Sequence, residues 1–189
     1  MKIAMWSGPR NLSTAMMYAF AARGDCAVVD EPLYAAYLAA TGLAHPMQQE
    51  VIASQSTDPL QVAADCIGPI PQGQSLFYQK HMTLHMIPAF DRGCMRGLTN
   101  VFLIRHPARV VASYAKKREG PKLADIGFVQ QAELFDQVAQ DLGHAPLVID
   151  SADIRATPIS RSFARAGPTS ARRRAGSRGC GRNPSLATG

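Results

Sequence analysis

Residues 2–14, KIAMWSGPRNLST, decide the fold. The first five residues of this stretch are mostly apolar, as in a buried strand, and the next five contain the Ser, Gly, Pro and Asn typical of a turn. From residue 12 to residue 23 apolar side chains recur at helical spacing, and Asn11 or Ser13 is available as the N-cap. The stretch therefore predicts a strand, a tight turn and a helix.

The same alternation continues along the chain. Further strands are expected at residues 26–29, 75–79, 100–104 and 146–149, and further helices at 34–40, 47–53, 60–66, 107–117 and 128–142. Strands separated by helices predict an α/β fold with a parallel β-sheet flanked by helices. Ligands of such sheets bind beyond the carboxyl ends of the strands, which directs attention to the loops at residues 7–13, 30–32 and 105–107.

Length and composition are those of a globular domain. The chain has 189 residues, of which 47% are hydrophobic, and it contains neither an apolar run long enough to span a membrane nor a signal-peptide pattern at its start. The cysteines are scattered without a CxxC pair, so neither a zinc site nor a disulfide framework is expected: Cys26, Cys66, Cys94 and Cys180. This usage favours a reducing, cytoplasmic compartment.

Charge divides the chain into two parts. Residues 1–154 hold 12 Lys and Arg against 14 Asp and Glu, whereas residues 155–189 hold eight Arg and no acidic residue. The net charge of +6 therefore belongs to the tail, and the body is not expected to bind nucleic acid. We expect an α/β domain over residues 1–158 and an Arg-, Gly-, Ala- and Ser-rich tail over residues 159–189.

The tail lacks the periodicity of a packed element and is expected to be disordered. Its abrupt change of composition at Ile159 suggests a reading-frame shift or a damaged gene end, since an out-of-frame translation of GC-rich DNA overproduces these residue types. The alternative is a natural disordered basic arm, with RNA or an anionic membrane as its partner.

The turn after the first strand suits a phosphate. Backbone N–H groups and the positive end of the following helix converge there, and Gly8 allows a close approach. Arg10 adds a charge-assisted donor, and Ser13 and Thr14 add hydroxyls. The GxxxxGK[ST] pattern of nucleotide hydrolases is absent, which argues against an ordinary ATPase or GTPase. The alternative is a plain strand–helix turn with a surface Arg10.

A second stretch, residues 101–114, VFLIRHPARVVASY, has the same layout. A buried strand brings Arg105 to the sheet edge, Pro107 suits the first turn of a helix, and Ser113 follows about two turns later. Arg105 and Ser113 can converge on one phosphate. The alternative is that Arg105 closes the start of the helix and pairs with a carboxylate.

Taken together, the two stretches resemble the P-loop-type sulfotransferase family, particularly its bacterial members that act on small molecules. SGPRNLST between strand and helix is similar to the family's 5′-phosphosulfate loop, and the spacing from Arg105 through Pro107 to Ser113 is similar to its 3′-phosphate motif. Residues 150–158 also resemble the strand and acidic loop that follow in the family. The resemblance implies 3′-phosphoadenosine 5′-phosphosulfate as co-substrate, bound by Gly8, Pro9, Arg10, Asn11, Leu12, Ser13, Thr14, Arg105 and Ser113.

An acceptor hydroxyl or amine also needs a general base. Glu31 follows the second predicted strand, beside the first loop, and some bacterial sulfotransferases have a glutamate in a similar place. The rival is His81, because residues 79–82 resemble the Lys-Thr-His strand end of cytosolic members with one residue missing. A histidine has the readier pKa, whereas Glu31 needs burial to raise its own. Lys80 is expected to assist the leaving group.

The implied activity is sulfuryl transfer to a hydroxyl or amine of a small molecule; the alternative is a relative that binds nucleotide without catalysis. The acceptor pocket of the family lies in a variable helical insert, here about residues 33–75. No metal is implied, and His45, His85 and His144 lack ligand spacing and are interpreted as ordinary surface or core histidines.

Overall fold

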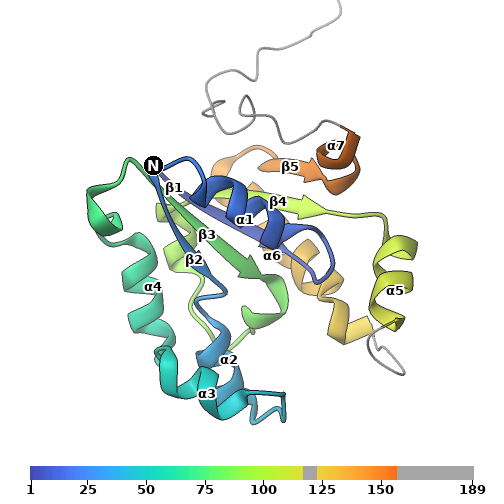
Figure 1. Ribbon diagram of the computed structural model, residues 1–189, viewed down its shortest axis with the longest axis horizontal. Coiled ribbons are helices and arrows are strands. Elements are labelled where there is room, and N and C mark those ends of the chain that lie inside the picture. Colours follow the sequence, from blue (N-terminus) through green and yellow to red (C-terminus); the bar gives the residue numbers. More distant parts are fainter. Residues whose placement is uncertain (117–122, 157–189) are drawn as a thin grey trace, which may run out of the picture.

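The computed structural model describes residues 1–116 and 123–156, so the expected tail lies outside the described residues. Its centre is one sheet of five parallel strands in the order β2-β3-β1-β4-β5 (Figure 1). The strands are β1 (Lys2–Ser7), β2 (Cys26–Asp30), β3 (Leu76–Met82), β4 (Thr99–Ile104) and β5 (Leu147–Asp150).

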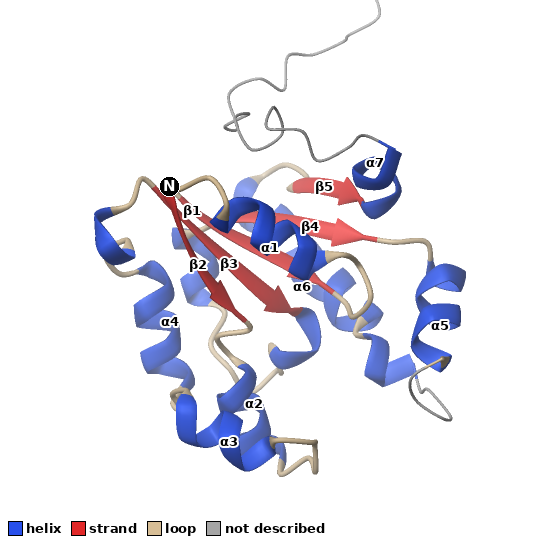
Figure 2. Cartoon of the chain, in the orientation of Figure 1, coloured by secondary structure: helices blue, strands red, loops and turns tan. Residues whose placement is uncertain are grey.

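Helices follow the strands and cover the sheet (Figure 2). They are α1 (Ser13–Ala21), α2 (Tyr34–Thr41), α3 (Gln48–Ser54), α4 (Pro59–Ile67), α5 (Pro107–Ala115), α6 (Phe128–Leu142) and α7 (Ser151–Ala156). Short 3-10 turns lie at Pro71–Gly73, Thr83–His85, Gly93–Gly97 and Leu123–Ile126. The predicted α/β class, with a parallel sheet flanked by helices, is confirmed.

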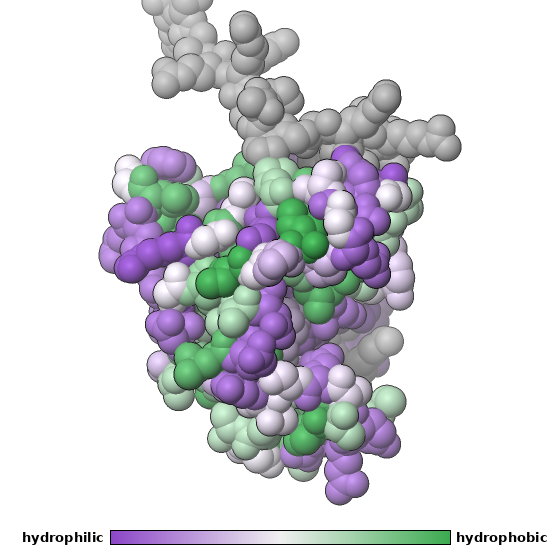
Figure 3. All heavy atoms as spheres, turned by 90° about the vertical axis from the view of Figure 1, so that its left-hand side faces the viewer, coloured by the Kyte–Doolittle hydropathy of each residue, from purple (hydrophilic) through white to green (hydrophobic). Residues whose placement is uncertain are grey.

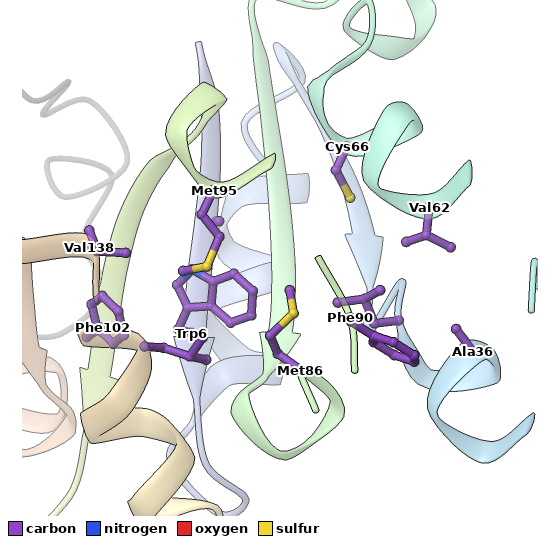
Figure 4. Close-up of a cluster of buried hydrophobic side chains, with 12 residues drawn as sticks. Trp6, Ala36, Val62, Cys66, Met86, Phe90, Met95, Phe102 and Val138 are labelled. Carbon is purple, nitrogen blue, oxygen red and sulfur yellow. The ribbon is translucent and has the colours of Figure 1, made fainter. Parts of the chain in front are cut away.

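Each face of the sheet carries its own apolar core. On one face α1 lies across the sheet (Figure 1), where Met16 and Met17 pack against side chains that include Met5. On the other face Trp6 and Phe102 pack with residues of α2, α4 and α6, which include Ala36, Val62, Cys66 and Val138 (Figure 4). Burial on both faces explains why β1, the central strand, is almost wholly apolar.

The carboxyl ends of four strands meet at one edge. Ser7, the last residue of β1, is in register with Met82 of β3 and Leu103 of β4. Asp30, the last residue of β2, is in register with Lys80 of β3. The three loops selected from the sequence therefore leave the sheet on the same side, where ligands of parallel sheets bind.

Most observed elements differ from the predicted ones by one or two residues at an end, and two larger differences bear on the site. Strand β3 continues through Met82, so that Lys80 and His81 lie within a strand that is paired on both sides. Residues that resembled an acidic loop after β5 form helix α7, whose start is stabilised by the Asp150 carboxylate, which accepts the Ala152 N–H at 2.8 Å. An Asp that caps the first turn favours helix at this position.

The face that carries α4 and the edge strand β2 mixes hydrophilic and hydrophobic side chains in small areas (Figure 3). Within residues 1–116 and 123–156, no helix is long and apolar enough to cross a membrane.

Candidate functional site

The loop after β1 turns sharply where the sequence predicts a phosphate loop. Arg10 and Leu12 have φ of 64° and 68°, while the intervening Asn11 has no positive φ, so the hand of the backbone alternates. Alternation of this kind directs successive N–H groups to one side and forms an anion-binding concavity. Gly8 is needed for packing, because a Cβ there would lie 2.6 Å from the carbonyl oxygen of Ile126.

Helix α1 begins without a side-chain cap. The residue at the N-cap is Leu12, so the prediction of an Asn11 or Ser13 cap is wrong. The Asn11 amide instead donates a hydrogen bond to the Leu103 carbonyl at 3.1 Å, in a buried position. Within the described residues, the N–H groups of the first turn of α1 therefore lack a side-chain acceptor. Because these groups carry the positive end of the helix dipole, they suit an anionic ligand.

The remaining loop residues differ in exposure. Ser13 is buried and Thr14 is exposed, while Pro9 is half-buried. The buried hydroxyl of Ser7 has no hydrogen-bond partner among residues 1–116 and 123–156. Because Ser7 is the last residue of β1, this hydroxyl is a further donor available at the sheet edge.

Arg10 joins the two predicted phosphate loops. Its Nε donates a hydrogen bond to Ser113 Oγ at 3.0 Å, and its backbone carbonyl accepts one from Arg105 Nη1 at 2.7 Å. Burial, with Arg155, Arg109 and Arg10 nearby, lowers the pKa of Arg105. The structure thus brings the first loop, the end of β4 and the last turn of α5 together at one place.

Glu31 lies at the end of β2 beside a buried lysine. Lys80 Nζ is 2.5 Å from Glu31 Oε1 and 2.6 Å from Asp30 Oδ1. Burial opposes the charge of Lys80, but the Coulombic attraction of Glu31 and the hydrogen bonds to both carboxylates raise its pKa overall. Glu31 has φ of 47°, a conformation that is uncommon outside glycine and that clusters at functional sites.

His85 is a neighbour of Glu31 that sequence reasoning missed. Its ring stacks on Tyr34 and on Tyr37, with centroid distances of 4.6 and 4.9 Å, and its Nδ1 is 3.9 Å from Glu31 Oε2. Burial, with smaller effects of Lys80, His81 and His45, lowers the pKa of His85 to about 3. The ring is therefore neutral at pH 7 and forms no ion pair with Glu31.

His81 has a different environment from Lys80, its neighbour in β3. Its ring stacks on Trp6 at a centroid distance of 4.4 Å, and its Nε2 is 3.2 Å from Gln79 Oε1. The side chain is only 3% exposed and lines an apolar cavity together with Cys66, Met86 and other residues of that core. Burial lowers the pKa of His81 to about 3.

Among the residues that the structure describes, no group of three or more His, Cys, Asp or Glu side chains is placed to hold a metal ion. Arg10, Arg105 and the start of α1 instead gather positive charge around the loops after β1 and β4. This arrangement suits an anionic ligand, and the Glu31 carboxylate lies at the same edge of the sheet.

Comparison with known proteins agrees with this geometry. A family model described as a sulfotransferase domain matches residues 1–167. The chain is similar to branched-chain-amino-acid aminotransferase-like protein 1 of Arabidopsis thaliana, with 33% identity over 157 residues, which are 82% of this chain and 28% of that protein. Its similarity to aminotransferase-like protein 2 of the same plant is 32% over 158 residues, or 82% of this chain and 27% of that protein. The chain spans little more than a quarter of the length of these relatives. With a match that covers most of its length, the chain belongs to the sulfotransferase domain family.

Proposed function

We propose that the protein binds 3′-phosphoadenosine 5′-phosphosulfate and transfers its sulfuryl group to a hydroxyl or amine of a small molecule. The observation that carries the proposal is the double contact of Arg10 with Ser113 and Arg105. It joins two loops suited to phosphate into a single site, as a ligand with an anionic group at each end requires.

The described residues fit such a donor. The uncapped start of α1 and the alternating backbone of the first loop offer N–H groups to the 5′ end, with Arg10, Ser13 and Thr14 beside them. Arg105 offers donors to the second phosphate, because among residues 1–116 and 123–156 one of its five N–H groups, on Nη1, is hydrogen-bonded.

Bound donor supplies an electrophilic sulfur and a good leaving group. In the transfer, the acceptor oxygen or nitrogen forms a bond to sulfur, the bond from sulfur to the phosphate oxygen breaks, and that oxygen leaves with the electron pair as adenosine 3′,5′-bisphosphate. In such displacements most of the rate enhancement comes from positioning and electrostatic stabilisation, which the loops and their arginines would provide here.

Glu31 takes up the proton that the acceptor loses. Its carboxylate is partly exposed at the sheet edge, with 24% of the side-chain surface accessible, and the ion pair with Lys80 orients it. His81 is the weaker candidate, because it is enclosed beside Trp6 and its low pKa makes it a poor base. Lys80 is held by two carboxylates and is placed to order Glu31.

The test compares ligands by thermal shift and then measures transfer. Adenosine 3′,5′-bisphosphate at 100 times its Kd is expected to raise the melting temperature by about 5–10 °C, and ATP is expected to have little effect. Donor consumption in the presence of a mixture of small phenols, alcohols and amines then reports turnover. Equal stabilisation by ATP contradicts the donor assignment, whereas binding without turnover favours the non-catalytic relative considered above.

A further inference from the structure

The 3-10 turn Thr83–His85 follows β3 directly, at the carboxyl edge of the sheet (Figure 1). Two of its three residues are polar, yet Thr83 is 0% exposed and His85 is 4% exposed. The proposed transfer uses neither of them. Because burial of a polar side chain costs free energy unless its groups are satisfied, the contacts of these two residues need an explanation.

Thr83 holds the start of α6 close to the end of β1. Its Oγ1 donates a hydrogen bond to the Gly127 carbonyl at 3.0 Å and lies 3.5 Å from the carbonyl oxygen of Ser7, the last residue of β1. Gly127 has φ of +70°, and a Cβ on it would lie 2.8 Å from Thr83 Oγ1. The approach is therefore so close that Gly127 has no room to move towards the turn.

The residue before Gly127 contacts the anion-binding loop. The carbonyl oxygen of Ile126 would lie 2.6 Å from a Cβ on Gly8, so the backbones of the two segments touch. Residues 126 and 127 thus lie in contact with the loop through Gly8 and with the turn through Thr83. Because packed interiors transmit strain, a displacement of Thr83 would shift the loop as well.

His85, at the other end of the turn, lies beside the proposed base. Its ring is stacked on Tyr34 and on Tyr37 of α2, and its Nδ1 is 3.9 Å from Glu31 Oε2. The Lys80 ammonium binds the other oxygen, Oε1. Within the part of the chain that the structure describes, the buried Nδ1 of His85 has no hydrogen-bond partner.

This nitrogen suits the state of Glu31 after proton uptake. A carboxylate only accepts hydrogen bonds, whereas the acid formed when Glu31 takes the acceptor's proton has an O–H to donate. With its own proton on Nε2, His85 offers Nδ1 to that O–H, and the separation must shorten by about 1 Å for the bond to form. Burial lowers the pKa of His85 to about 3, so the ring accepts the hydrogen bond without taking the proton.

We infer that the turn Thr83–His85 is a positioning element that couples the donor loop to the base. Thr83 sets the loop after β1 through residues 126 and 127, and His85 orients Glu31 and accepts its hydrogen bond after proton transfer. Because both residues belong to one short, buried turn, they fix the base relative to the donor. The role of His85 rests on the proposed function, whereas that of Thr83 requires only that the loop binds the nucleotide.

Thr83→Val tests the first contact, because it removes the hydroxyl and keeps the shape of the side chain. Isothermal titration calorimetry of the full chain with adenosine 3′,5′-bisphosphate is expected to show a roughly 3- to 10-fold loss of affinity, since binding must then order the loop. Thr83→Ser keeps the hydroxyl and should recover most of the affinity. Thr41→Val is the matched control, because the exposed Thr41 hydroxyl also donates to a carbonyl, that of Tyr37.

His85→Phe tests the second contact, because it keeps an aromatic ring between Tyr34 and Tyr37 and removes Nδ1. We expect kcat to fall about 10- to 100-fold, while the affinity for the bisphosphate stays within about twofold. His144→Phe, at an exposed histidine after α6, should have the wild-type kcat. A purely structural role of the turn would instead lower the melting temperatures and leave affinity and kcat unchanged.

The double variant Thr83→Val/His85→Phe tests the coupling itself. Thr83→Val should also lower kcat at saturating donor, because the donor is displaced relative to Glu31. Residues that act as a unit have non-additive effects, so the double variant should lose less activity than the product of the two single losses. A loss equal to that product would show that the two residues act independently and would overturn the coupling.

The outcomes separate the turn from the proposed function. A wild type that binds and turns over, with unchanged affinity in Thr83→Val or unchanged kcat in His85→Phe, overturns the inference and leaves the donor assignment standing. A wild type that binds the bisphosphate without turnover overturns both the proposed transfer and the coupling, although weaker binding by Thr83→Val would still show that Thr83 shapes the loop. A wild type that binds no bisphosphate overturns the donor assignment and the inference together.

Discussion

Arg10 and Ser113 are 103 positions apart in the sequence, yet the Nε of Arg10 donates a hydrogen bond to the Ser113 hydroxyl oxygen at 3.0 Å. This bond fixes the loop after β1 against the last turn of α5. With the Arg105 bond to the Arg10 carbonyl, it gives the anion-binding edge of the sheet a defined shape before a ligand binds. Such preorganisation reduces the ordering that binding would otherwise require.

Replacement of either loop arginine is expected to weaken nucleotide binding. Arg10→Ala and Arg105→Ala each remove a charge-assisted contact, which costs ~1.5–3 kcal/mol, so the affinity for adenosine 3′,5′-bisphosphate should fall roughly 10- to 150-fold. Calorimetric titration measures the change. Arg96→Ala is the control, because Arg96 is exposed, lies on the 3-10 turn before β4 and pairs with Asp141. Unchanged affinity in both variants would rule out these loops as the donor site.

Glu31→Gln is expected to abolish most turnover while nucleotide affinity stays nearly constant. The amide can still accept a hydrogen bond from Lys80, so local geometry is preserved while the base is lost, and loss of a general base typically costs about 10²–10⁴-fold in rate. Steady-state rates at saturating donor, together with a binding titration, separate the two effects.

If His81 is the base instead of Glu31, the two variants are expected to exchange their effects on turnover. If Glu31→Gln keeps wild-type turnover and His81→Ala loses it, the base is His81. A His81→Ala variant that melts at a lower temperature but turns over normally supports the structural role that its stacking on Trp6 indicates.

Stability is expected to fall as the pH is lowered below about 6.5. His81 and His85 have pKa values lowered to about 3 by burial, whereas histidine in an unfolded chain titrates near 6.5. Between these values the unfolded chain binds more protons, so stability is fully present above pH 6.5 and is lost towards pH 3. From pH 7 to pH 5 each histidine should contribute a loss of about 2 kcal/mol.

Urea unfolding at several pH values measures this loss, and His85→Gln isolates one of the two contributions. The variant should lose about 2 kcal/mol less than the wild type between pH 7 and pH 5. Parallel pH curves for the two proteins would contradict the buried, neutral state of His85.

Gly8→Ala is expected to damage the first loop. The added methyl group would lie 2.6 Å from the Ile126 carbonyl oxygen, and relief of such a contact typically costs about 1–3 kcal/mol and shifts the backbone. Nucleotide affinity should therefore fall along with stability. Gly24→Ala also destabilises, because φ there is +81°, but it meets no atom within 4 Å and should leave affinity unchanged. Equal nucleotide affinity in the two variants would show that Gly8 does not shape the site.

Much of the fold could be predicted from local patterns. Helix α6 has the predicted bounds of residues 128–142, because its apolar residues recur at helical spacing and Gly143 ends it with φ of 70°. The end of β3 could not be predicted as well, because Lys80 and His81 are polar. They belong to the strand because they pair with β1 and β2, and these contacts are not visible in the local sequence. The sequence family itself was recognisable from two loops.

Contacts between distant residues account for what the sequence did not show. The Asn11 side chain donates a hydrogen bond to the Leu103 carbonyl of β4 and does not cap helix α1. No local sequence pattern indicates this long-range contact. His85 meets Tyr34 and Glu31 only because β2 and β3 are neighbours in the sheet. Arg155 lines one pocket with Arg105 and Arg109 only because β5 pairs with β4.

The most direct test of the account is a crystal structure of the full chain with adenosine 3′,5′-bisphosphate. We predict that the 5′-phosphate lies against the N–H groups of residues 8–14 and that the second phosphate lies beside Arg105, with Glu31 facing the position of the acceptor. A nucleotide bound elsewhere, or one whose phosphates contact neither loop, would contradict the central claim that these two loops form one donor site.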